Sequence, residues 1–408
     1  MKSISIENLD VIFGDHSEKA LSLLDQGKTR QEIIDETGLV VGVDNVSLDV
    51  NQGEICVLMG LSGSGKSSLL RAVNGLNKIT RGSLKIKDGD DEVDLASCNE
   101  ATLRHLRTER ISMVFQKFAL MPWLSVLDNV AFGLEMQGVP KKERRLRAQE
   151  KLDMVGLGEW AEQFPHELSG GMQQRVGLAR AFAMDSDILL MDEPFSALDP
   201  LIRAQLQDEL LDLQKKLNKT IIFVSHDLDE ALKIGSRIAI MESGKLIQYS
   251  KPEQIILKPK TQYVKDFVAH TNPLNVLRGR SLMNSANELV SDEQDRIQIC
   301  DQSDIWLEKT DKNWAVTGEN DYEVVEWSSQ LECSELSEDS IVIASPDIEM
   351  RDAIEIRYHT GHPIVLVEDN ELIGTLNDHD FYHALLGKYN DDDSVVTGTT
   401  SSKKDKAA

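Results

Sequence analysis

The chain has 408 residues, of which 69 are acidic and 44 are basic, so its formal net charge is −25. This length allows more than one domain with a sizeable core, and a hydrophobic fraction of 41% excludes a fully disordered polymer. The acidity argues against a nucleic-acid-binding protein, because phosphate contacts need clustered lysine and arginine. The longest apolar run, from Ile55 to Leu61, has only the length of a strand, so no membrane span is expected.

The N-terminus has no apolar signal core, which predicts a protein that stays in the cytoplasm. The cysteines form no CxxC pair and no cluster with histidine, so we expect neither a disulfide framework nor a zinc site. They are Cys56, Cys98, Cys300 and Cys333.

Residues 1–270 alternate short apolar runs with helical patterns. Near-continuous apolar runs are typical of strands buried on both faces of a parallel sheet; they occur at 54–59, 112–115, 187–192 and 220–225. Hairpins are predicted at 83–87, turning at Asp88-Gly89, and at 237–241, turning at Ser243-Gly244. A leucine stripe predicts a helix at 203–217, and helical patterns between 125 and 185, including 141–154, predict an inserted helical subdomain.

A glycine-rich loop lies between the first of these strands and a helical run at 67–74, the context that a phosphate loop requires. Its backbone N–H groups can surround phosphate oxygens, and the helix N-terminus adds its positive dipole. Lys66 is expected to reach the β- and γ-phosphates, and the Ser67 hydroxyl to ligate Mg²⁺. The alternative is a plain glycine turn. The candidate nucleotide-binding residues are Gly60, Leu61, Ser62, Gly63, Ser64, Gly65, Lys66, Ser67 and Ser68.

Two carboxylates follow the apolar run at 188–191. Asp192 is expected to join the Mg²⁺ shell, directly or through water. Glu193, one residue further, is placed to polarise a water molecule in line with the γ-phosphate. The alternative interpretation is the N-cap region of a helix.

Two further polar side chains end neighbouring strands of the predicted sheet. His226 follows 221–225, where a contact with the γ-phosphate is favoured over a structural role. Gln116 follows 112–115, and its amide oxygen could complete the Mg²⁺ shell. These residues extend the predicted site to the same edge of the sheet as the phosphate loop.

At this point the motifs resemble those of ABC-transporter ATPases over about residues 1–270. The run Leu168-Ser169-Gly170-Gly171-Met172-Gln173-Gln174-Arg175 is similar to the family signature, although glutamine is common at the position of Met172. The run from Asp192 to Asp199 resembles the Walker B motif and D-loop, and Gln116 and His226 match the Q-loop and the switch histidine. The resemblance implies an α/β P-loop NTPase fold of ABC type, with a RecA-like core, an antiparallel β-subdomain and an inserted helical subdomain at about 117–185.

The family mechanism implied is ATP hydrolysis with Mg²⁺ in a head-to-tail dimer of two copies. One copy would supply the phosphate loop, Asp192, Glu193 and His226. The other would supply Ser169, Gly170, Gly171 and Met172, while Asp199 would communicate between the sites. A hydroxyl and glycine N–H groups at a helix start form a second anion site, which dimer closure completes. Closure and reopening would drive a membrane permease.

A helical insert at about 15–42 resembles that of the ATPases of quaternary-amine importers, which serve glycine betaine, proline betaine and choline. Other runs, such as 267–278, are closest to the choline importer ATPase, so choline is favoured over glycine betaine. An aromatic residue that stacks on adenine is expected at Phe13, displaced by the insert; the alternative for Phe13 is plain core. The resemblance implies a peripheral protein on the cytoplasmic face of the bacterial inner membrane, coupled through the permease to a periplasmic or extracellular amine-binding protein, and no nucleic acid.

Residues 271–388 resemble a small α+β CBS-like module, with one motif of helix, strand, turn, strand and helix from 345 onwards. A degenerate first copy could occupy 278–344. A regulatory role and a purely structural role both stay open. The polar segment 389–408 is expected to be a disordered tail. Residues 271–408 hold 29 acidic and 11 basic side chains, so most of the negative charge lies outside the ATPase region.

Two alternatives remain. A soluble ABC ATPase acting on ribosomes or DNA would also carry these motifs, although such proteins usually have two nucleotide modules or basic surfaces. The apolar segment 118–123, just after Gln116, is either a dock for a permease helix or part of the core of the helical subdomain.

Overall fold

The computed structural model describes residues 1–386 except 197, 270, 293, 295, 300–304, 311–313, 319, 320 and 329. The predicted tail at 389–408 and Cys300 lie outside the described residues. The chain divides into two units. The first comprises Met1–Ile255 and Pro259–Thr271, and the second comprises Ile256–Lys258 and the chain from Asn272 onwards.

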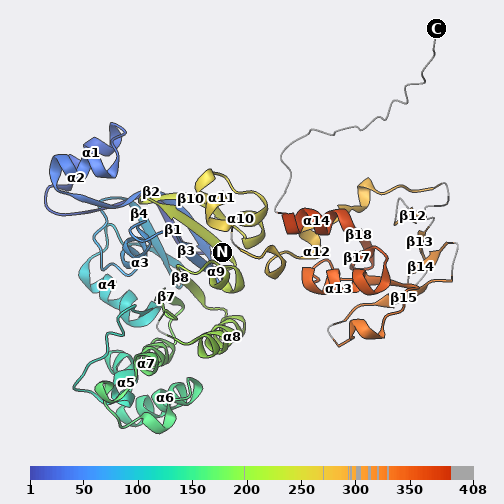
Figure 1. Cartoon of the computed structure of the whole chain (residues 1–408). Coiled ribbons are helices and arrows are strands. Elements are labelled where there is room, and N and C mark those ends of the chain that lie inside the picture. Colours follow the sequence, from blue (N-terminus) through green and yellow to red (C-terminus); the bar gives the residue numbers. More distant parts are fainter. Residues whose placement is uncertain are drawn as a thin grey trace. The chain divides into compact units, whose positions relative to one another are not determined.

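A six-stranded sheet forms the centre of the first unit (Figure 1). Its central strands are buried along their whole length, as the continuous apolar runs predict, and all neighbours run parallel except β9 and β10. The four predicted strands are confirmed to within one residue at each end. In spatial order the strands are β10 (Lys245–Ser250), β9 (Arg237–Glu242), β3 (Ile55–Met59), β8 (Thr220–Val224), β7 (Ile188–Asp192) and β6 (Ile111–Val114).

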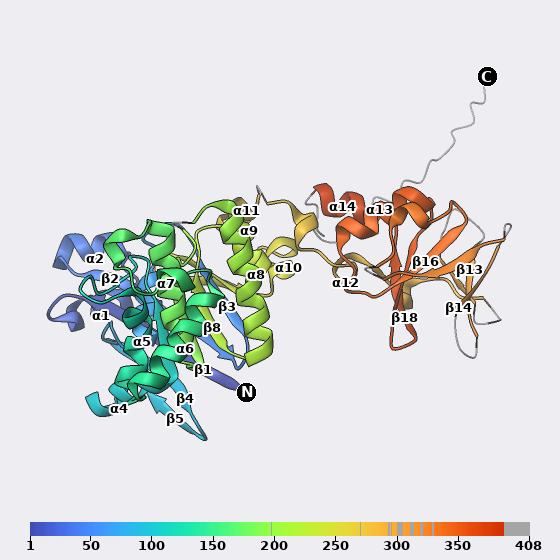
Figure 2. The same cartoon turned by 90° about the horizontal axis from the view of Figure 1, so that it is seen from below.

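An antiparallel sheet with the order β2-β1-β4-β5 accompanies it, and the hairpin of its last two strands is visible in Figure 2. The sequence patterns predicted that hairpin but not the two long strands, because bulges interrupt their alternation. Asn8 and Asn45 have φ of 47° and 49°, and the register shifts between the paired strands. The strands are β1 (Lys2–Phe13), β2 (Val40–Asn51), β4 (Arg81–Asp88) and β5 (Asp91–Asp94).

Two helices, α1 (Ser17–Asp25) and α2 (Arg30–Thr37), connect the first two strands and form the predicted insert. They close over a small apolar cluster that includes Ala20 and Ile33. The expected limits of 15–42 are too wide at the C-terminal end, since residues from Val40 onwards belong to β2. Pairing with β1 recruits these residues into the sheet.

Three helices make a layer of their own, drawn in green in Figure 1: α5 (Val126–Met136), α6 (Lys141–Met154) and α7 (Gly170–Ala183). Their apolar faces meet in one cluster that includes Val130, Leu152 and Val176. A separate apolar cluster lies beneath the phosphate loop. It includes Leu58 of β3, the strand before the loop, and Leu70 of α3 (Lys66–Val73), the helix after it.

Helix α8 spans Pro200–Leu217 and begins three residues before the predicted start. Asp199 caps it, because its carboxylate accepts a hydrogen bond from the Ile202 N–H, and proline is favoured at the first helical position. The leucine stripe marked only the buried face, so it missed this first turn.

The second unit contains a five-stranded sheet with the order β11-β18-β17-β16-β15 and a three-stranded sheet of β12, β13 and β14. From Met350 the observed order is α13 (Met350–Thr360), β17 (Ile364–Glu368), β18 (Glu371–Leu376) and α14 (Asp378–Leu386), the order that the sequence predicts. Its assignment as a CBS-like module stays a prediction. The other strands are β11 (Asn284–Ser285), β12 (Ile297–Gln298), β13 (Trp306–Lys309), β14 (Trp314–Thr317), β15 (Glu323–Glu326) and β16 (Ser340–Ala344).

Across both described units, every helix is too short or too polar to cross a membrane.

Candidate functional site

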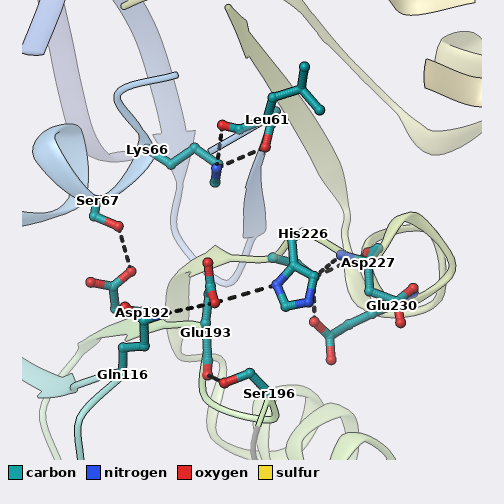
Figure 3. Close-up of polar contacts among 12 residues, drawn as sticks. Leu61, Lys66, Ser67, Gln116, Asp192, Glu193, Ser196, His226, Asp227 and Glu230 are labelled. Carbon is teal, nitrogen blue, oxygen red and sulfur yellow. Dashed lines mark hydrogen bonds and ion pairs between the residues drawn. The ribbon is translucent and has the colours of Figure 1, made fainter. Parts of the chain in front are cut away.

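The phosphate loop connects β3 to α3, as its motif requires. Gly60 and Gly65 have φ of 139° and 102°, and a Cβ atom at Gly60 would lie 2.1 Å from the Met241 carbonyl oxygen. Only glycine fits this backbone. Lys66 Nζ donates to the carbonyl oxygens of Gly60 and Leu61 at 2.8 and 3.0 Å (Figure 3). Burial lowers the pKa of Lys66, while the Asp192 and Glu193 charges act in the opposite direction.

The middle of the loop is exposed to solvent, and the residues on either side of it are buried. Leu61, Ser62 and Gly63 are exposed, whereas Ser64 is buried with its hydroxyl unpartnered. Ser67 and Ser68 lie in the first turn of α3. The arrangement leaves the exposed backbone N–H groups of the loop accessible to an anion.

The parallel register brings three predicted side chains to one edge of the sheet. Val114 pairs with Met191, and Asp192 pairs with Val224, so Gln116, Glu193 and His226 follow neighbouring strand ends. Gln116 Nε2 donates to Glu193 Oε2 at 3.0 Å, and His226 Nδ1 lies 3.4 Å from the same oxygen (Figure 3). The Glu193 carboxylate therefore lies between an amide and an imidazole.

Glu193 has φ of 50°, a left-handed conformation that is strained for a residue with a Cβ. Its N–H donates to the Val224 carbonyl at 3.1 Å, and its carbonyl accepts from Ser196 Oγ at 3.0 Å. Both groups of the backbone are thus fixed, and the turn aims the carboxylate along the edge of the sheet. Strain of this kind is concentrated at functional sites.

Asp192 is almost fully buried at the end of β7. Its two oxygens have different partners: Ser67 Oγ donates to Oδ1 at 2.8 Å, and Arg71 Nη2 lies 3.2 Å from Oδ2. A hydroxyl and a carboxylate oxygen side by side are hard ligands of the kind that Mg²⁺ prefers. These residues therefore fit a magnesium ion bound next to the phosphate loop.

A buried network supports the backbone before and after His226. Ser225 Oγ donates to Glu230, Gln207 Nε2 donates to Glu230 Oε1 at 3.1 Å, and the Asp227 N–H donates to Ser225 Oγ at 3.0 Å. Burial raises the pKa of Glu230, and the two donated hydrogen bonds only partly offset this. The imidazole itself projects to solvent, with 64% of its side chain exposed.

Phe13 ends β1 beside the phosphate loop. A Cβ atom at Gly42 would lie 2.5 Å from Phe13 Cε2 and 3.1 Å from Ser68 Oγ, so the ring and the start of α3 flank the same glycine. The residue is 39% exposed, so part of it is accessible to solvent. Its position and its free surface are suited to stacking on a base.

The signature residues lie at the start of a different helix. Ser169 is the N-cap of α7, and its hydroxyl accepts from the Met172 N–H at 3.4 Å. Ser169 and Gly170 are exposed, while Gly171 and Met172 are half-buried. This helix packs in the cluster of the helical layer and not in the one beneath the phosphate loop. The exposed Asp199 is the N-cap of α8.

Sequence reasoning missed several side chains near these groups. Arg71 is four residues after Ser67 on α3, so helical spacing could have placed it beside Asp192. Tyr263, on α11 (Gln262–Val268), accepts a 3.3 Å hydrogen bond from the Leu61 N–H across 202 residues of sequence. No local sequence pattern predicts a contact between residues so far apart in the chain.

A family model described as "ABC transporter" matches residues 43–196 of the chain. Over 264 residues the chain is 52% identical to the glycine betaine/proline betaine transport system ATP-binding protein ProV of Escherichia coli, a match that covers 65% of each chain. It is 49% identical over 296 residues to the glycine betaine transport ATP-binding protein OpuAA of Bacillus subtilis, covering 72% of this chain and 70% of that one. The match thus spans slightly less than two thirds of ProV.

A further relative is the trimethylamine N-oxide transport system ATP-binding protein TmoW of Ruegeria pomeroyi, 44% identical over 320 residues, covering 74% of this chain and 93% of that one. Among solved structures, the dimeric ATP-binding cassette MJ0796 bound to ADP and Pi superposes with a TM-score of 0.53 at 31% identity, covering 61% of this chain and 98% of that one. These relatives confirm the resemblance inferred from the motifs. The chain therefore belongs to the ABC transporter family of ATP-binding proteins.

Proposed function

We propose that this chain is the ATP-hydrolysing subunit that powers import of a quaternary amine through a membrane permease. The observation that carries the proposal is the contact of Glu193 with both Gln116 and His226 at the edge of the sheet that also presents the phosphate loop. The transport names of the relatives support the transport role over a soluble ABC ATPase acting on ribosomes or DNA.

In this proposal the phosphate loop and Lys66 bind the ATP phosphates while Phe13 stacks on adenine. Glu193 accepts a proton from a water molecule whose oxygen attacks the γ-phosphorus. The bond to the bridging oxygen breaks, and ADP and inorganic phosphate are released. His226 binds the γ-phosphate, and Gln116 orients Glu193. Mg²⁺, held by Ser67, Asp192 and the Gln116 amide oxygen, would offset the charge of the phosphate oxygens.

Two copies of the chain would act together, head to tail. Ser169 and Gly170 are exposed at the start of α7, where a hydroxyl and free N–H groups suit the γ-phosphate bound by a partner copy. Gly171 and Met172 complete this segment, and Asp199 would relay the state of one site to the other. The dimeric MJ0796 structure supports this arrangement by analogy.

The permease would dock at the segment after Gln116. Trp123 is 73% exposed there, and the buried Asn129 side chain donates to the Met121 and Leu124 carbonyls, which fixes the segment's shape. Leu120 packs against the cluster of the helical layer, so the segment has both a core side and a free side. We place the chain at the cytoplasmic face of the bacterial inner membrane, with an amine-binding protein acting on the far side.

The test is uptake into vesicles that contain the chain, its permease and its binding protein, with radiolabelled choline and glycine betaine as alternative substrates. ATP-dependent uptake of either, lost in the Glu193→Gln variant, is the expected result. ATP hydrolysis without uptake of any quaternary amine would contradict the transport role. The ratio of the two uptake rates decides between choline, which the sequence favours, and glycine betaine.

A further inference from the structure

The outer side of the phosphate loop is contacted by a side chain that lies outside the glycine-rich motif. Arg30 is the first residue of α2 in the helical insert, and its Nη1 donates a 2.9 Å hydrogen bond to the Gly63 carbonyl oxygen. Its Nε is buried and has no hydrogen-bond partner. Burial lowers the pKa of this guanidinium group, and the charge of Asp44 acts in the opposite direction. The insert thus places a partly desolvated cation against the loop.

The loop needs such support because its middle has no packing of its own. Gly63 has φ of 79°, and a Cβ atom there would meet nothing within 4 Å. Glycine also loses more conformational freedom on ordering than any other residue. The shape of the loop therefore depends on hydrogen bonds to its backbone, of which the Arg30 bond is charge-assisted and so of the stronger kind.

Within the motif, the Lys66 ammonium donates to the Gly60 and Leu61 carbonyls. Three further bonds to this stretch are neutral. Ser64 N–H donates to the Leu61 carbonyl at 3.1 Å, Gly244 N–H donates to the Ser64 carbonyl at 2.9 Å, and Leu61 N–H donates to the Tyr263 hydroxyl at 3.3 Å. None of these groups adds positive charge next to the phosphates. Arg30 is therefore the group outside the motif that, among these contacts, supplies both a constraint and a charge.

Ion pairs attach the insert to the antiparallel sheet, so the helix that carries Arg30 has a defined position. Arg81 of β4 bridges Asp10 of β1 at 2.6 Å and Asp25, the last residue of α1, at 2.8 Å. At the start of α2, the Thr29 side chain and the Glu32 side chain each accept a hydrogen bond from the other's backbone N–H. These contacts fix both helices before any ligand is considered.

We propose that Arg30 is a positioning residue for the phosphate loop, and that the insert holds the loop in the shape that receives the α- and β-phosphates of the nucleotide. Ordering the loop in advance reduces the entropy lost on binding, so affinity rises without any new contact to the γ-phosphate. The inference rests on the proposed binding of ATP. It assigns the insert a role in nucleotide affinity that the motifs described in the sequence analysis do not include.

The experiment uses the purified full chain and fluorescence titration with mant-ATP and mant-ADP, together with the KM and kcat of ATP hydrolysis. Arg30→Ala is expected to weaken both nucleotides by the same factor, about tenfold, and to raise KM with kcat kept within about twofold. Arg30→Lys, which keeps the charge and a donor, is expected to recover most of the affinity. Lys28→Ala removes a neighbouring charge that pairs with Glu36 instead, and should change neither affinity.

Three outcomes would overturn the inference. The first is unchanged affinity in Arg30→Ala, whether or not its melting temperature falls. The second is a loss for ATP without a loss for ADP, and the third is an equal loss in Lys28→Ala. If Arg30→Ala does not fold, Arg30→Gln takes its place, with an expected loss of about fivefold for both nucleotides. A wild-type chain that binds neither nucleotide would contradict the proposed function itself, so the two failures are distinguishable.

Discussion

Gln116 Nε2 donates a 3.0 Å hydrogen bond to Glu193 Oε2 across 77 residues of sequence. Gln116 also begins the segment that leads into the helical layer. Arg180 of α7 holds this segment through the carbonyls of Phe118 and Ala119, at 3.0 and 2.6 Å. Helix α7 and the Glu193 carboxylate are therefore connected through hydrogen bonds at the two ends of a short stretch of chain, residues 116–119.

Replacing Glu193 with glutamine removes the base but keeps the shape of the side chain. We expect Glu193→Gln to lower the rate of ATP hydrolysis by at least about a hundredfold, the usual contribution of a general base, and to retain ATP binding. Phosphate release and mant-ATP titration measure the two properties. Asp229→Asn, which changes an exposed carboxylate on α9 (Leu228–Ile234), is the matched control. Turnover near that of the wild type would refute the role assigned to Glu193.

Asp192→Asn tests the magnesium site. The variant keeps an oxygen near Ser67 but loses the negative charge, so the Mg²⁺ concentration for half-maximal hydrolysis is expected to rise about tenfold or more. A magnesium titration of the ATPase rate measures it. Asp187→Asn, just before the opposite end of the same strand, should leave the titration unchanged. An unchanged Mg²⁺ requirement in Asp192→Asn would exclude Asp192 as a ligand.

Phe13→Ala tests the stacking position. Loss of base stacking is expected to lower the affinity for ATP about tenfold, while the affinity for inorganic tripolyphosphate, which has no base, should stay unchanged. Competition against mant-ATP measures both ligands. Phe164→Ala is the control, because that ring is also 39% exposed. An equal loss for tripolyphosphate would mean that Phe13 shapes the phosphate loop rather than contacting adenine.

Ser169→Arg tests the proposed dimer. A bulky cation at this N-cap should block the start of α7 from a partner's γ-phosphate without changing ATP binding by a single copy. In the Glu193→Gln background, light scattering after gel filtration is expected to show an ATP-dependent dimer, which Ser169→Arg abolishes. The exposed Ser97, in the turn that follows β5, provides the control Ser97→Arg. Dimerisation of Ser169→Arg at the same ATP concentration would argue against the head-to-tail arrangement.

The sequence predicts the sheet edge well because two simple rules act there. Apolar runs without alternation indicate buried parallel strands, and parallel strands end at the same edge, so Gln116, Glu193 and His226 were expected at one edge. The strand order that makes them neighbours comes from the structure. The sequence patterns did not predict β1 and β2, because bulges at Asn8 and Asn45 interrupt the alternation of apolar and polar residues.

Contacts made across long stretches of chain could not be predicted in this way. Arg30 and Tyr263 meet the loop from elements 33 and 202 residues away, and neither belongs to a motif. Only the packing of the insert on β1 and β2, and of α11 within the first unit, determines where they lie. In the second unit, β11 and β12 have two residues each, too few for any period to be recognised.

Glu230 should give the chain a measurable dependence of stability on pH. Its pKa is raised in the folded protein, so the native state binds more protons than the unfolded state above the usual value of 4.5. Stability therefore falls as the pH rises from that value to the folded pKa. Glu230→Gln should flatten this part of the profile in chemical denaturation followed from pH 4 upwards. A profile identical to that of the wild type would mean that the carboxylate titrates normally.

The two hydrophobic clusters beneath the phosphate loop and within the α5–α7 layer have no residue in common. Each is stabilised by its own apolar burial, so local opening of one does not by itself expose the other. Helix α7 also meets β6 and holds the segment after Gln116 through Arg180, so the two parts are joined by contacts other than a shared cluster. A small shift of one part against the other would move Ser169 away from the site of a second copy while leaving both apolar clusters intact.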